Sequence, residues 1–159
     1  MNRKLTILAM SLLVFSLAAR AADDPVLGTW KFNAAKSKYN AGSPPKSQVT
    51  KYEAAGDAVK LSTDIVDAQG KQIHVEYTAK FDGKQYPYTT TDPAAPAGQT
   101  VSMKRIDANT TERTVHLKGK SLNTIRRVIS KDGKTMTQTQ KGTNAAGQPV
   151  NNVAVYDKQ

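Results

Sequence analysis

Two adjacent arginines, Arg126 and Arg127, stand within residues 121–130, where each alternating face carries apolar residues and one arginine. Successive side chains of a β-strand point to opposite faces, so in a strand one of the two guanidinium groups points toward the interior. An arginine keeps its proton in a folded protein, and when buried it needs a carboxylate, carbonyl groups, water or a bound anion as its partner. The chemistry that this pair could perform is the binding of an anionic group.

Two roles are open to the inward arginine. It is either the anchor of an anionic ligand, or a cover that stacks on the ring of Trp30 and closes one end of a barrel. Alternation does not decide which of Arg126 and Arg127 points inward, because a shift of one residue in the register reverses the face.

The sequence contains none of the patterns that mark common catalytic and metal sites. It has no Gly-x-Ser-x-Gly elbow, no His-Glu-x-x-His pair, no phosphate-binding loop and no cysteine. Its two histidines, His74 and His116, are far apart in the sequence and fall on polar faces beside charged residues. We therefore expect a protein that is not an enzyme and that holds no metal and no cofactor.

Residues 72–81 alternate most clearly between apolar and polar side chains. Every second residue is apolar, and these residues form one face: Ile73, Val75, Tyr77, Ala79 and Phe81. A period of two is typical of a strand with one buried face. Tyr77 is therefore an inward-facing residue that could contact a ligand.

Similar short runs, separated by turn residues, continue to the end of the chain. The predicted strands after residue 31 cover residues 47–54, 59–66, 72–81, 85–90, 100–107, 110–118, 121–130, 135–141 and 152–158. Strands at roughly 8–12-residue spacing are typical of all-β sandwiches and barrels. Pro87 predicts an edge or a bulge at residues 85–90. We expect an all-β, antiparallel up-and-down β-barrel of about 8–10 strands, lidless or with one short helical turn after the first strand.

Residues 27–31, Leu-Gly-Thr-Trp-Lys, are predicted to form that first strand. Trp30 is the only tryptophan, and its indole combines a large apolar body with one N–H that needs a partner when buried. We expect Trp30 to plug one end of the barrel as a structural residue. Residues 33–39 could then form the helical turn, with Asn33 as its N-cap.

Residues 1–21 have the pattern of a secretory signal peptide. Arg3 and Lys4 precede an apolar run at residues 5–17, and Ala19-Arg20-Ala21 fits a small-x-small cleavage site. The apolar run is shorter than the roughly 20 residues that a membrane-spanning helix needs. We expect cleavage after Ala21, a mature domain of residues 22–159, no membrane span, and a periplasmic or secreted location in a bacterium.

The chain is basic, with a formal net charge of +10. A basic surface favours anionic partners. The lysines are scattered, however, and the aromatic residues are not interleaved with basic ones as in RNA-binding motifs. We expect a small amphipathic or acidic ligand as the partner and no specific nucleic acid, while the oligomeric state is not determined by the sequence.

Both ends of the chain resemble a known group of barrels, the calycins. Residues 28–31, Gly-Thr-Trp-Lys, match the opening of fatty-acid-binding proteins and the Gly-x-Trp opening of lipocalins. Residues 30–39 also resemble the opening of small secreted bacterial lipocalin-like proteins of unknown function. The similarity to the last three strands of the fatty-acid-binding family lies in Arg126-Arg127 and in residues 132–134, 142–143 and 155–158.

This resemblance implies a barrel around a ligand cavity, with an interior arginine and a tyrosine near the ligand carboxylate. Tyr156 stands where the last strand of the family carries the tyrosine of Arg-x-Tyr, but Ala154 replaces the arginine. The family also has a helix-turn-helix lid between its first two strands, and residues 33–46 are too short to form one.

The residues and the resemblance together predict an exported β-barrel protein that binds a small, partly apolar ligand, anionic if an arginine anchors it. The predicted ligand-binding residues are Arg126, Arg127, Tyr77 and Tyr156. The alternative is a surface interaction or structural protein whose barrel is filled by its own side chains and binds no ligand.

Overall fold

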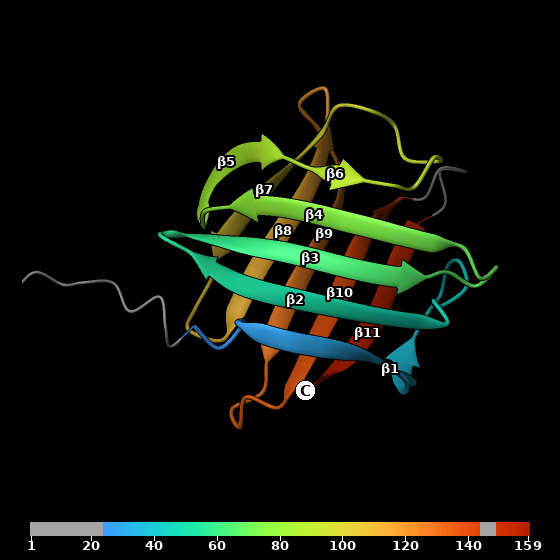
Figure 1. Ribbon diagram of the computed structural model, residues 1–159, viewed down its shortest axis with the longest axis horizontal. Coiled ribbons are helices and arrows are strands. Elements are labelled where there is room, and N and C mark those ends of the chain that lie inside the picture. Colours follow the sequence, from blue (N-terminus) through green and yellow to red (C-terminus); the bar gives the residue numbers. More distant parts are fainter. Residues whose placement is uncertain (1–23, 144–148) are drawn as a thin grey trace, which may run out of the picture.

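The computed structural model describes residues 24–143 and 149–159, which form eleven strands in one antiparallel sheet (Figure 1). The strands are β1 (Gly28–Lys38), β2 (Ser47–Ala55), β3 (Ala58–Val66), β4 (Gln72–Ala79), β5 (Asp82–Pro87), β6 (Thr89–Thr90), β7 (Gln99–Arg105), β8 (Thr110–Leu117), β9 (Lys120–Ile129), β10 (Thr135–Thr143) and β11 (Pro149–Lys158). No helix that could cross a membrane occurs in these residues. The predicted signal peptide, residues 1–21, lies outside the described residues.

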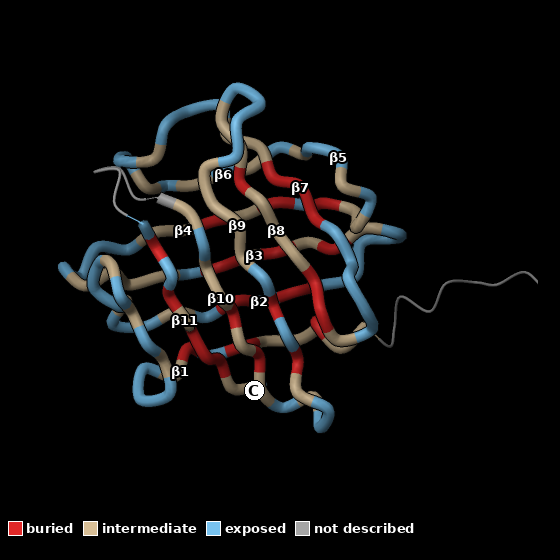
Figure 2. Tube along the Cα trace, turned by 180° about the vertical axis from the view of Figure 1, so that it is seen from behind, coloured by how far each residue is buried: buried red, intermediate tan, exposed pale blue. Residues whose placement is uncertain are grey.

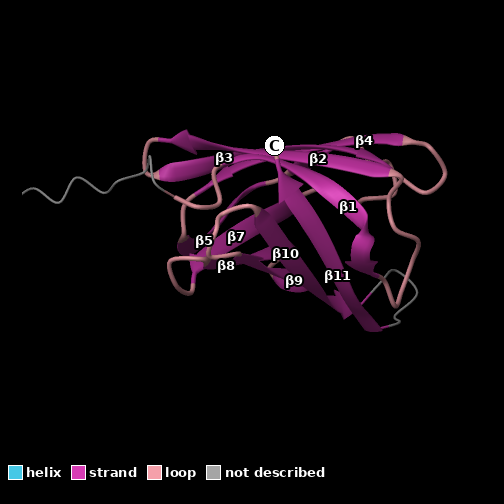
Figure 3. Ribbon diagram, turned by 90° about the horizontal axis from the view of Figure 1, so that it is seen from below, coloured by secondary structure: helices cyan, strands magenta, loops and turns pink. Residues whose placement is uncertain are grey.

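The sheet curls into a nearly closed up-and-down barrel, which confirms the predicted all-β fold class. Strands β1 to β4 form one layer, and strands β7 to β11 cross behind it at a steep angle (Figures 1 and 3). From β7 to β11 each strand pairs with the next, and β11 pairs with β1. The first and last strands therefore join the two layers.

The barrel is open between β4 and β7, and one short segment spans this opening. β5 pairs with β7 at one edge of the sheet, and after Tyr88 the chain pairs as β6 with β4 at the other edge. The single strand predicted at residues 85–90 is thus divided in two, and the sheet has eleven strands instead of about ten. Pro87, which has no N–H to donate, ends β5 at this edge, as predicted.

β1 contains a bulge where the sequence predicted a helical turn. Asn33 pairs with Val155 of β11, and the next paired residue of β1 is Lys38, opposite Val153. Within the bulge, the Asn33 Oδ1 accepts a hydrogen bond from the Lys36 N–H at 3.1 Å. Asn33 therefore makes a capping bond, but the alternative with a helical turn after the first strand is wrong, because pairing with β11 resumes beyond the bulge.

The interior is apolar at one end and becomes polar toward the middle, as β9 and β10 show. Ile129 of β9 lies opposite Met136 of β10, and both are buried. Two residues further along, Arg127 lies opposite Gln138, and both are also buried. In Figure 2 buried positions alternate with exposed ones in the second half of β9 and with intermediate ones in the first half of β10. Side chains two residues apart share one face, so the polar pair lies directly beside buried apolar residues. We call the apolar end of the interior, which includes Ile129 and Met136, the apolar floor.

Trp30 belongs to this apolar floor. Its side chain has no exposed surface, and its Nε1–H donates a hydrogen bond to the Val26 carbonyl oxygen at 2.8 Å. The cation over its ring is Lys158, whose Nζ lies 5.1 Å from the ring centre. The guanidinium of Arg127 lies over the Tyr52 ring instead, so the alternative in which the inward arginine covers Trp30 is wrong.

Candidate ligand-binding cavity

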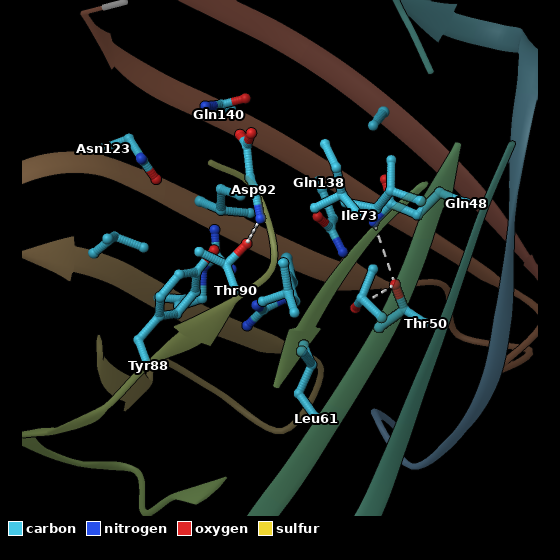
Figure 4. A pocket seen from close by; sticks show the side chains of 18 of the residues that line it. Gln48, Thr50, Leu61, Ile73, Tyr88, Thr90, Asp92, Asn123, Gln138 and Gln140 are labelled. Atoms are coloured by element: carbon cyan, nitrogen blue, oxygen red, sulfur yellow. Dashed lines mark hydrogen bonds between the residues drawn. The ribbon is translucent and has the colours of Figure 1, made fainter. Parts of the chain in front are cut away.

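A cavity of about 330 Å³ lies inside the barrel between the two layers. Figure 4 shows Asn123, Gln138 and Gln140 on strands of one layer, with Thr50 and Ile73 on strands of the other. The volume lies at the lower end of the range for ligand pockets, roughly 300–1,000 Å³. The side chains of the barrel therefore leave room for a small molecule.

Arg127 lines this cavity, and only 2% of its surface is exposed. Its Nη2 donates a hydrogen bond to the Tyr77 hydroxyl oxygen at 3.1 Å, and its Cζ lies 5.4 Å from the centre of the Tyr52 ring. The Nε and Nη1 atoms of the same guanidinium have no hydrogen-bond partner. Among the described residues, this buried positive charge has no carboxylate partner.

The guanidinium of Arg127 stays charged despite its burial. Desolvation acts to lower the pKa of Arg127, but the nearby Tyr52 and Tyr77 hydroxyls outweigh it, and the pKa lies above its ordinary value. Burial raises the pKa of Tyr52 to about 12 and also raises the pKa of Tyr156. At neutral pH the cavity therefore presents a cation among uncharged phenols.

Of the four residues predicted to bind a ligand, two line the cavity, one is buried without lining it, and one is exposed. Arg127 and Tyr156 line the cavity, and both are buried. Tyr77 is also buried and accepts a hydrogen bond from the Arg127 guanidinium, but it does not line the cavity. Arg126 is exposed on the outer face of β9 and does not line the cavity, which corrects its choice as a ligand-binding residue. Arg127 is thus the inward-facing arginine of the pair.

The cavity contains a second arginine, Arg113 of β8, which was not among the predicted ligand-binding residues. It lines the cavity, and its buried Nε has no hydrogen-bond partner. Alternation could have found it, because Arg113 stands two residues before Val115, which is buried on the inner face. Arg113 pairs with Ile125, two residues from Arg127, so the two arginines stand on neighbouring strands of one wall.

Carboxamide side chains make up much of the remaining wall. The six that line the cavity are Gln48, Gln99, Asn123, Gln138, Gln140 and Asn152. The Oδ1 of Asn123 is buried without a hydrogen-bond partner. Gly142 of β10 lies opposite Asn123, and a Cβ at Gly142 would stand only 2.8 Å from the Leu122 carbonyl oxygen. The glycine therefore allows the two strands to approach closely where Asn123 enters the cavity.

One carboxylate among the described residues, that of Asp92, lines the cavity, and it already has partners. Its Oδ1 accepts hydrogen bonds from Lys71 Nζ at 2.9 Å and from the Ala94 N–H at 3.1 Å. The bond from Lys71 is the main reason that the pKa of Asp92 is lowered. Since Lys71 neutralises Asp92, the charge of the two cavity arginines is not balanced by it.

Neither histidine lines the cavity. His74 Nδ1 lies 2.7 Å from Asp64 Oδ1, and His116 Nε2 lies 2.8 Å from Ser102 Oγ. Over residues 24–143 and 149–159, no group of three or more His, Cys, Asp or Glu side chains could hold a metal ion. The chemistry that the cavity offers is therefore that of guanidinium, phenol and amide groups.

Alkaline pH is expected to weaken the fold through Tyr52. Burial raises the pKa of Tyr52 from 10.0 to about 12, so the folded state retains a proton that the unfolded chain releases near pH 10. The stability that this contributes is complete below pH 10 and is lost as the pH rises through 12. Denaturant unfolding of the wild type and of Tyr52→Phe over this interval should show a smaller decline in the variant. Equal declines would contradict a role for Tyr52.

The chain was compared with known protein families, curated proteins and solved structures. No family model and no curated protein matches the chain. Among solved structures, the chain is similar to zebrafish ileal bile acid-binding protein, crystallised in complex with cholic acid. The two chains are 14% identical, with a TM-score of 0.46 over 85% of this chain and 99% of the other. No site residue and no role is carried over from it.

Proposed function

We propose that this protein is an exported binding protein whose barrel holds a small, partly apolar organic anion at Arg127. One observation carries the proposal: the guanidinium of Arg127 is buried on the cavity wall with two unpartnered nitrogens and no carboxylate beside it among the described residues. Removing a charge from water costs several kcal/mol unless an opposite charge replaces the water. An anion that accepts hydrogen bonds from Nε and Nη1 would supply that charge.

The cavity also offers apolar contacts to the rest of such a molecule. Leu61, Ile65 and Ile73 line it from the β1–β4 layer, and Ile125 lines it from the opposite layer. A small organic acid could therefore place its carboxylate against Arg127 and its carbon skeleton between the layers.

Calorimetric titration with hexanoate and with hexan-1-ol tests the proposal, because the two molecules share a carbon chain and differ in charge. We expect hexanoate to bind more tightly than the alcohol. Arg127→Gln should weaken hexanoate binding about tenfold or more, since hydrogen bonds to charged groups contribute about 1.5–3 kcal/mol. Arg126→Gln, the matched control on the outer face of β9, should change neither affinity.

Two results would contradict this proposal. One is equal affinity for the acid and the alcohol in all three proteins, which would show that no charge takes part in binding. The other is an absence of heat in every titration, which would favour the surface interaction or structural protein.

We also propose that residues 1–21 direct export and are then removed. The support is the basic start at Arg3 and Lys4, the apolar run at residues 5–17, and the small residues around the proposed cut. N-terminal sequencing of protein recovered from the periplasm or the medium should begin at Ala22, or within a residue or two of it. Mature, soluble protein that still begins at Met1 would overturn the export proposal.

A further inference from the structure

We infer that the anion bound in this cavity carries several hydroxyl groups, as a sugar acid does. The inference rests on the proposed function, because it specifies the rest of the molecule that Arg127 holds. Ligand pockets are lined mostly by apolar and aromatic side chains, with only a few polar groups. The wall of this cavity instead carries six carboxamides, two guanidinium groups and the hydroxyls of tyrosines and threonines.

The unpartnered atoms in the wall include donors, an acceptor and one group that is both. Arg127 Nε, Arg127 Nη1 and Arg113 Nε are hydrogen-bond donors, Asn123 Oδ1 is an acceptor, and the Tyr52 hydroxyl can donate and accept. A carboxylate accepts hydrogen bonds and donates none, so it would satisfy the arginines and leave Asn123 without a partner. A hydroxyl group on the same molecule would donate to Asn123, and the Tyr52 hydroxyl can bond to either group of such a molecule.

Carboxamide side chains of β10 line the wall beside Asn123 and Arg127. Asn123 and Arg127 stand four residues apart on the inner face of β9, and Gln138 and Gln140 of β10 lie opposite Arg127 and Ile125. Figure 4 shows Asn123, Gln138 and Gln140 on the same wall of the cavity. An acyl chain along this row would cover the amides without bonding to them, which is unfavourable, whereas hydroxyl groups can both donate to them and accept from them.

Glucuronate and glucose, added to hexanoate and hexan-1-ol, separate the effect of charge from that of hydroxyl groups. The four molecules have the same number of carbon atoms. Hexanoate and glucuronate carry a carboxylate, and glucuronate and glucose carry several hydroxyl groups. We expect glucuronate to bind at least about tenfold more tightly than hexanoate or glucose, because only glucuronate satisfies both the arginines and Asn123.

Two variants of the amide wall extend the test. Asn123→Leu should weaken glucuronate binding about tenfold and leave hexanoate binding unchanged, since hexanoate has no hydroxyl group to donate to Asn123 Oδ1. Gln140→Leu, a second variant of the same wall, should act in the same direction if Asn123→Leu does not fold. Asn151→Leu is the matched control, because Asn151 is exposed on β11. Arg127→Gln should weaken both acids.

The outcomes distinguish this inference from the proposed function. If hexanoate binds as tightly as glucuronate and Arg127→Gln weakens both, the hydroxylated ligand is wrong and the anion-binding function stands. The same conclusion follows if both amide variants fold and bind glucuronate like the wild type. If glucose binds as tightly as glucuronate, or if neither acid binds, both the inference and the proposed function are wrong.

Discussion

Replacement of Trp30 by alanine is expected to lower the free energy of unfolding by about 3–5 kcal/mol. Trp30 is completely buried, and it belongs to the same apolar cluster as Val26, Met103 and Met136. The substitution also leaves the Val26 carbonyl oxygen without its hydrogen bond from the indole. Denaturant unfolding of the wild type and the variant measures the loss directly.

A matched control for Trp30→Ala is the exposed apolar residue Ile106, of which 48% is accessible. Ile106→Ala should change the free energy of unfolding by no more than about 0.5 kcal/mol. In the wild type, the fluorescence of Trp30 should be blue-shifted and protected from aqueous quenchers. Losses of similar size at the two positions, or a freely quenched Trp30, would show that the apolar floor is wrongly assigned.

Replacement of Arg127 by methionine is expected to stabilise the ligand-free protein by about 1 kcal/mol or more, although it removes a hydrogen bond to Tyr77. Methionine fits a similar space and adapts its shape, and it removes a buried charge that has no carboxylate partner among the described residues. Sites that bind ligands often reduce stability in this way. Denaturant unfolding in ligand-free buffer measures the change.

Arg126→Met serves as the control for that measurement, since Arg126 is exposed on the same strand. Its effect should stay within about 0.5 kcal/mol. If Arg127→Met instead lowered the free energy of unfolding by several kcal/mol, Arg127 would be a structural residue that holds Tyr77 and Tyr52 in place.

Alternation predicted the fold well wherever one face of a strand is apolar. Alternation predicts that Tyr77 points inward, because every second residue of its strand is apolar, and the structure buries it. The side chain of Asn33 can cap a helical turn, yet pairing with β11 outweighs that local preference. A local side-chain hydrogen bond can be predicted from neighbouring residues of the sequence. Pairing with a strand more than a hundred residues away cannot be predicted in this way.

The cavity was harder to predict because its walls are polar. β10 reads Thr-Met-Thr-Gln-Thr-Gln-Lys from Thr135, with polar residues on both faces, so Met136 alone marks the face of Gln138 and Gln140 as interior. Their positions follow from pairing with β9, which places Gln138 opposite Arg127. The same pairing decides between Arg126 and Arg127, a choice that alternation within one strand left open.

The claim that Arg127 holds an anion inside the barrel is tested most directly by native mass spectrometry. Wild type and Arg127→Met would be recorded under identical gentle conditions, each with and without added hexanoate or glucuronate. We expect a bound organic acid on the wild type, from the cell or from the added probe, and none on the variant. A wild type that remains at the mass of the bare chain with both probes, or an equal adduct on the variant, would contradict it.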